Sequence, residues 1–112
     1  MAGFDQYHEP ANELPQEIRT FARMIASLQE ECEAINWYQQ RISVEQDEEA
    51  KRIMEDAQQE EFLHFSMDLE FLLRRTPKWR AGAKRILFQD GDILENKEKG
   101  EDDESEIEPK LP

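Results

Sequence analysis

The chain has 112 residues, which is enough for one small domain. It holds 27 Asp and Glu against 14 Lys and Arg, a net charge of −13, and this acidity argues against nucleic acid as a partner because phosphate binding needs a basic surface. A single cysteine, Cys32, excludes an internal disulfide framework and fits the reducing cytoplasm, and no apolar run approaches the roughly 18 residues that a membrane span requires.

A polar leader covers residues 1–11, and a first long helix is predicted from about residue 12 to Ile42. Pro15 lies near its start, where proline is tolerated because the first N–H groups of a helix have no partner. Apolar residues then follow at alternating spacings of three and four, which is typical of a heptad stripe: Ile18, Phe21, Ile25, Leu28, Cys32, Ile35 and Ile42. Cys32 is therefore predicted to be a core residue.

A second helix is predicted to follow a short turn and to end near Arg75. Ser43 and Gln46 resemble a capping box, and Asp47 with the two glutamates after it suits a helix start. Because the connector is so short, the two helices are expected to form an antiparallel hairpin.

A shorter third helix is predicted over about 78–88, so the helical domain covers residues 12–88. Residues 89–112 are heavily acidic and poor in aromatic side chains, and this tail is expected to be mostly disordered. The sequence thus predicts an all-α fold, an antiparallel two-helix hairpin with a short C-terminal helix.

The second helix carries two apolar stripes, although a lone hairpin can bury only one stripe per helix. One stripe passes through charged positions: Ala50, Met54, Ala57, Glu61, His64, Asp68 and Phe71. The other consists of Phe62, Phe65, Leu69 and Leu72. Three short helices also bury little apolar surface. We therefore expect the chain to oligomerise.

Glu61 and His64 continue the first stripe, where a lone buried charge would be costly. Residues three apart share a helix face and could bind one ion together. If the turn is centred near residue 46, Glu31 of the first helix stands opposite Glu61, so that two carboxylates and an imidazole meet inside the hairpin. The alternative is a buried hydrogen bond between Glu61 and His64, with Glu31 in solvent.

Di-iron carboxylate bundles take one Glu from each of two helices and a Glu-x-x-His from each of the other two. One chain here supplies half of that set, and a dimer would supply all of it. We therefore predict a metal centre on the dimer axis, with Glu31, Glu61 and His64 of each protomer as ligands. The same ligand types also accept manganese or zinc.

The stretches EECEAINWYQQR (30–41) and QQEEFLHFSMDLEFLLRR (58–75), with HEP near the start and KWR in the third helix, resemble the encapsulated ferritins. The resemblance implies a ferritin-like four-helix bundle and a ferroxidase that oxidises Fe(II) to Fe(III) at a di-iron centre, with two iron ions per dimer. It also implies that dimers join into an open ring, a homodecamer, which resides within an encapsulin nanocompartment in the cytoplasm and feeds iron storage there.

By the same resemblance, four residues correspond to the ferroxidase centre: Glu31, Glu61, His64 and Tyr38. Glu30 and Glu33 correspond to an acidic pair that attracts ions toward the centre, and calcium, manganese or zinc could occupy either place. Trp37 corresponds to an aromatic near the path of the ions. The tail ends in ESEIEPKLP and departs from the Gly- and Leu-bearing peptide by which the family docks on the encapsulin shell protein.

Two other functions stay open on the sequence. A non-catalytic metal-binding or metal-delivery dimer would hold metal without consuming oxygen. An acidic helical adaptor would assemble through its apolar stripes and hold no metal, but it would gain more from leucine at positions 61 and 64 than from a charged pair.

Overall fold

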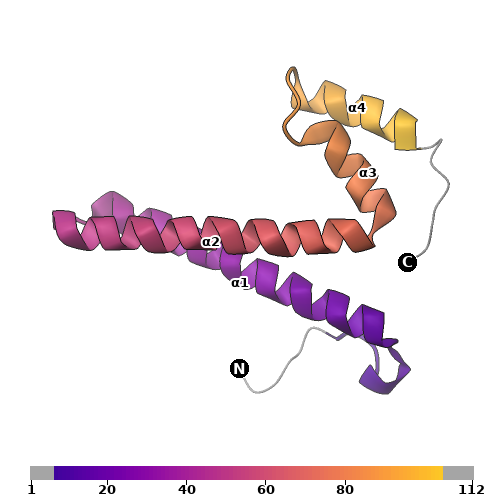
Figure 1. The fold of residues 1–112 in the computed structure, drawn as a ribbon, viewed down its shortest axis with the longest axis horizontal. Coiled ribbons are helices and arrows are strands. Elements are labelled where there is room, and N and C mark those ends of the chain that lie inside the picture. The colour runs from indigo at the N-terminus through magenta and orange to yellow at the C-terminus, as the bar shows by residue number, and fades with distance from the viewer. Residues whose placement is uncertain (1–6, 105–112) are drawn as a thin grey trace. The chain divides into compact units, whose positions relative to one another are not determined.

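A computed structural model describes residues 7–104, with side chains for residues 7–99. Every regular element in this range is helical (Figure 1): η1 (Ala11–Glu13), α1 (Gln16–Val44), α2 (Glu48–Arg75), α3 (Pro77–Ile86) and α4 (Ile93–Glu104). The predicted all-α fold is confirmed. None of the helices in this part of the chain is long and apolar enough to cross a bilayer. The chain divides into two units, one ending at Glu70 and the other beginning at Phe71.

In the first unit, α1 and the larger part of α2 lie side by side as a hairpin (Figure 1). The buried amide of Gln58, which is 7% exposed, joins them. Its Nε2 donates to the backbone oxygen of Ile35 at 3.2 Å and to Oε1 of Gln39 at 2.9 Å. The helices run in opposite directions because three residues, 45–47, connect them.

The turn between α1 and α2 is set by Asp47. Its Oδ1 accepts a hydrogen bond from the backbone N–H of Ala50 at 2.9 Å, which satisfies one of the unpaired donors at the start of α2. Ser43 instead donates its hydroxyl to the backbone oxygen of Gln40 at 2.7 Å. The predicted capping box of Ser43 and Gln46 is therefore wrong: α1 continues through Val44, so Ser43 is still inside a helix and cannot begin one.

Few apolar side chains of the hairpin are buried in a single chain. Among the described residues of the first unit, the buried apolar ones are Ala26 and Ile42. Several large ones are exposed: Ile18, Trp37, Val44, Ile53, Phe62, Leu63 and Met67. Cys32 is exposed as well, so its prediction as a core residue is wrong for the single chain. It is next to Glu31 and therefore about 100° around the helix from the side chain that faces α2.

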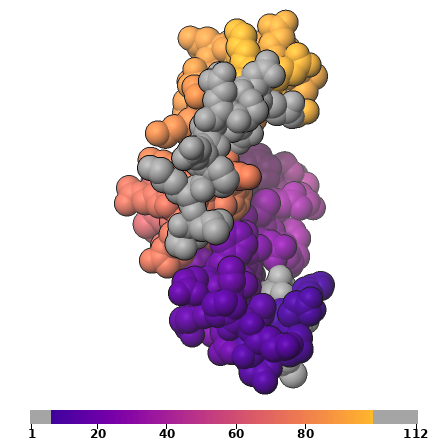
Figure 2. Space-filling view, turned by 90° about the vertical axis from the view of Figure 1, so that its right-hand side faces the viewer, coloured from indigo at the N-terminus to yellow at the C-terminus, as the bar shows by residue number. Residues whose placement is uncertain are grey.

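The second unit contains α3 and α4, which pack against each other. In Figure 2 their side chains, orange to yellow, gather into one body. The turn before α4 uses Gly91, whose φ of 95° is readily adopted only by glycine. Asp92 then caps α4, because its Oδ2 accepts the backbone N–H of Glu95 at 3.0 Å.

Helix α4 corrects one expectation. The sequence predicted a mostly disordered tail at 89–112, whereas residues 93–104 form a helix. An acidic composition indicates only that few residues of a segment are buried on average. It does not reveal that Asp92 caps this helix or that α3 packs against it. Residues 105–112, which include most of the segment with the departing docking sequence, lie outside the described residues.

Candidate metal centre

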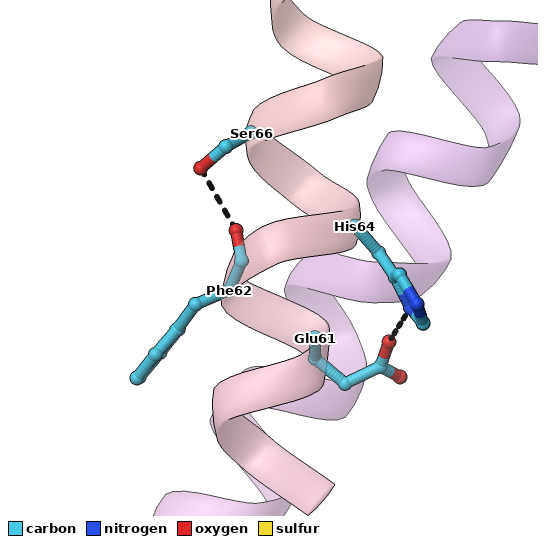
Figure 3. A network of polar contacts seen from close by, with 4 residues as sticks. All are labelled: Glu61, Phe62, His64 and Ser66. Carbon is cyan, nitrogen blue, oxygen red and sulfur yellow. Dashed lines mark hydrogen bonds and ion pairs between the residues drawn. The ribbon is translucent and has the colours of Figure 1, made fainter.

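Glu61 and His64 are held together on one face of α2 by the helix itself. His64 Nδ1 donates to Glu61 Oε1 at 2.9 Å (Figure 3). The side chains are 24% exposed for Glu61 and 47% for His64, and Phe62 points away from them. The hydrogen bond to the Glu61 carboxylate raises the pKa of His64 above its usual value, and the charges of Glu61, Glu31 and Glu60 add to this.

Glu31 approaches this pair from α1. Burial, which disfavours the charged form, raises the pKa of Glu31 from 4.5 to about 7. A hydrogen bond and charge repulsion from Asp68 contribute next, Glu61 adds repulsion, and the positive charge of His64 acts in the opposite direction. The charges of Glu61 and His64 therefore both act on the Glu31 carboxyl, which is partly buried.

Asp68 is the residue of this cluster that was not predicted as part of the site. One oxygen of Glu31, Oε2, and one oxygen of Asp68, Oδ2, are buried without a hydrogen-bond donor. Two carboxylate oxygens are both acceptors, so Glu31 and Asp68 can bond to each other only when one of them carries a proton. The signal was available in the sequence, since Asp68 lies on the same apolar stripe as Glu61 and His64.

The other predicted site residues lie on α1 with different surroundings. Tyr38 is half-buried, and the guanidinium carbon of Arg41 stands 5.4 Å from the centroid of its ring. Trp37 is about half exposed, and Glu30 and Glu33 face solvent.

The carboxylate and imidazole groups of this cluster would be more stable with a bound cation than in a protein interior without one. Buried acceptor oxygens that lack donors are costly, and carboxylate oxygens with an imidazole nitrogen are the ligand types of first-row divalent metals. Within the described residues, however, one chain does not gather three or more such groups closely enough to hold an ion. The centre predicted from the sequence draws its ligands from two chains, and one chain carries half of them.

Comparison with known proteins supports the resemblance to encapsulated ferritins. The chain is 44% identical to a ferritin-like protein of Thermotoga maritima, over 84% of this chain and 82% of that protein. It is 38% identical to an encapsulated ferritin-like protein of Rhodospirillum rubrum, over 77% of this chain and 61% of that protein.

The fold has a solved counterpart. A protein of Nitrosomonas europaea, known from its crystal structure, superposes with a TM-score of 0.76 at 39% identity, covering 80% of this chain and 99% of the other. The profile of the EncFtn-like family matches residues 6–90, a span that contains the hairpin and the Glu31, Glu61 and His64 cluster. This chain belongs to the EncFtn-like family.

Proposed function

We propose that this protein is a ferroxidase, which oxidises Fe(II) to Fe(III) at a di-iron centre shared across a dimer. Glu31, Glu61 and His64 of each protomer would be the ligands. The observation that carries the proposal is the placement of Glu31 against Glu61, His64 and Asp68, with buried oxygens of Glu31 and Asp68 that lack donors. Two divalent cations on the dimer axis would satisfy these oxygens and offset the repulsion between the carboxylates.

The residues of the centre suit iron oxidation. Carboxylates are hard ligands and stabilise Fe(III) relative to Fe(II), while His64 offers a nitrogen ligand. Two bound Fe(II) ions would supply two electrons, which together with two protons would reduce dioxygen to hydrogen peroxide. Because the pKa of Glu31 is about 7, this carboxyl carries a proton for part of the time at neutral pH in the empty centre and would release it when iron binds. Tyr38 would border the centre.

Residence in an encapsulin shell is part of the same proposal. The relative from Rhodospirillum rubrum is named an encapsulated ferritin-like protein, which supports a shell as partner. An open ring of dimers, the decamer that the family resemblance implies, cannot enclose mineral, so oxidised iron would be stored in the surrounding compartment. The exposed Glu30 and Glu33 would attract cations toward the centre.

A metal-binding or metal-delivery dimer is the second candidate. It is favoured by the chemistry of the ligands, since carboxylates and imidazole also bind manganese and zinc, which need not react with oxygen. An acidic adaptor is less well supported, because it leaves the buried oxygens of Glu31 and Asp68 unexplained.

The test is aerobic addition of Fe(II) to purified protein, with Fe(III) absorbance and native mass spectrometry recorded on the same samples. Glu31→Ala and Glu61→Ala are the test variants, and Glu55→Ala, an exposed glutamate of α2, is the matched control. Oxidation faster than the protein-free rate, lost in both test variants and kept in the control, would establish the centre. Oxidation at the protein-free rate by the wild type would refute the ferroxidase; bound metal would then favour the delivery dimer, and its absence the adaptor.

A further inference from the structure

The charge of this acidic chain is distributed unevenly. Residues 71–99 hold eight Lys and Arg against four Asp and Glu, a net charge of +4, although the whole chain carries −13. Six of these cations follow one another with no acidic residue between them: Arg74, Arg75, Lys78, Arg80, Lys84 and Arg85. An excess of one charge in one part of a chain indicates a surface that attracts the opposite charge. This basic stretch contains the whole of α3.

A pocket of about 340 Å³ lies within the second unit, lined by α3, by α4 and by the loop that connects them. Three of its lining residues are cations, two are amides and one is an acid: Lys84, Arg85, Gln89, Asp90, Asn96 and Lys99. Within the described residues, the ammonium groups of Lys84 and Lys99 form no ion pair with a carboxylate. The lining therefore offers positive charge that the protein itself does not neutralise.

Hydrogen bonds between side chains and the backbone fix the wall of this pocket. Nε2 of Gln89 donates to the backbone oxygen of Lys84 at 3.1 Å, and Nδ2 of Asn96 donates to the backbone oxygen of Asp90 at 3.1 Å. Gly91, with its positive φ, turns the chain between them. Each amide nitrogen carries a second N–H that can donate to a ligand. Because this wall is formed in the absence of a ligand, binding requires little further ordering of the loop.

The donors of the pocket are side chains and not the free N–H groups of a helix end. Helix α4 begins nearby, but Asp92 accepts the N–H of Glu95 with Oδ2 and the N–H of Asn96 with its backbone oxygen. Ammonium and amide groups that converge on one small space suit a ligand with several acceptor oxygens and a negative charge. A phosphate group has both properties.

We propose that the pocket between α3 and α4 binds a small phosphate-type oxyanion, held by the ammonium groups of Lys84 and Lys99 and by the amides of Gln89 and Asn96. The carboxylate of Asp90 lines the same pocket and repels such a ligand, so it limits the affinity. The pocket does not depend on the proposed ferroxidase centre, because the predicted metal ligands belong to the first unit.

Isothermal titration calorimetry of the full-length, metal-free protein with sodium phosphate tests this site, with sodium chloride adjusted to constant ionic strength. Lys84→Gln and Lys99→Gln each remove one cation of the pocket. Lys78→Gln is the matched control, because Lys78 is an exposed lysine of α3 that does not line the pocket. Circular dichroism checks that the variants are folded.

We expect each of the two test variants to raise the Kd for phosphate about fivefold, the value of one ion pair at an exposed site, and Lys78→Gln to change it less than about twofold. Asp90→Asn should lower the Kd about threefold, because it removes the repulsion. A wild type that does not bind phosphate overturns the inference. Equal weakening by Lys78→Gln also overturns it, since the anion would then be attracted by the general charge of α3.

A parallel titration with AMP distinguishes free phosphate from the phosphate group of a larger molecule. The two ligands carry nearly the same charge at neutral pH, so a difference in Kd reports contacts with the rest of the nucleotide. Tighter binding of AMP, weakened by the same two variants, supports a site for phosphate esters. Tighter binding of inorganic phosphate, weakened by the same variants, supports a site for the free ion.

Discussion

Gln58 of α2 donates its side-chain amide to Oε1 of Gln39 on α1 at 2.9 Å, and the same nitrogen reaches the backbone oxygen of Ile35. Gln58 is a buried polar side chain, and a bond of this kind sets the register of the hairpin because it is satisfied in one alignment of the two helices. The candidate centre lies farther along the same interface, so its geometry depends on this register.

We expect Gln58→Ala to lower the free energy of unfolding by roughly 1–3 kcal/mol, because it removes a buried hydrogen-bonded side chain and the packing around it. Urea denaturation followed by circular dichroism measures the change. Gln59→Ala is the control, since Gln59 is the exposed neighbour of the same type. Equal stability of the two variants would contradict the structural role of Gln58.

The start of α2 makes a second prediction. Asp47→Ala should lower the free energy of unfolding by about 1 kcal/mol, the usual value for loss of an N-cap, because the N–H of Ala50 loses its acceptor. Ser43→Ala should cost markedly less, since the Ser43 hydroxyl bonds a carbonyl within α1 and caps nothing. Thermal unfolding of both variants measures these losses of stability. A larger loss for Ser43→Ala than for Asp47→Ala would support the capping box of Ser43 and Gln46 that the sequence suggested.

Stability of the metal-free protein should fall as pH rises from about 4.5 to about 7, in part through Glu31. The folded state, with a raised Glu31 pKa, binds more protons than the unfolded state in this window, so raising the pH favours unfolding. His64, whose pKa is also raised, contributes stability at low pH that is lost as pH rises through its folded value.

Comparison of the wild type with Glu31→Gln isolates the first effect. Urea midpoints at pH 5.0 and 6.5 with a chelator should differ less in the variant, because glutamine does not titrate. His64, whose pKa is raised chiefly by its hydrogen bond to Glu61, remains in both proteins, so the comparison is of the two pH dependences and not of either one alone. An identical pH dependence would show that Glu31 titrates as an ordinary surface carboxyl.

Assembly supplies a fourth prediction. Met67 is 62% exposed in the single chain and follows His64 by three residues, so it lies beside the face that a second copy would cover. Met67→Asp should shift the native mass spectrum toward monomer by placing a charge in that interface. Met67→Leu is the matched control, because it keeps an apolar side chain at the same position. Loss of assembly in both variants, or in neither, would argue against this interface.

The sequence by itself determined the helices and the local pair. The bounds of α1 and α2 agree with its periodicity and turn signals to within a few residues at each end. Glu61 and His64 meet because three residues of an α-helix separate them, and this relation needs no tertiary information. The cap of α2 and the structure of the tail were harder to predict from the sequence. Several polar residues can begin or end a helix, and which of them does so depends on neighbouring contacts.

Only the tertiary structure decided which residue of α2 faces Glu31. Counting from a turn centred at residue 46 places Glu61 opposite, whereas the carboxyl that raises the pKa of Glu31 most is that of Asp68. Side chains lean toward the N-terminus of their own helix, so in an antiparallel pair a residue of α1 reaches away from the turn and meets a residue of α2 that is farther along than a simple count gives. The extent of that lean and the crossing of the helices depend on packing. The sequence therefore placed Asp68 on the same stripe as Glu61 and His64 but could not show that it interacts with Glu31.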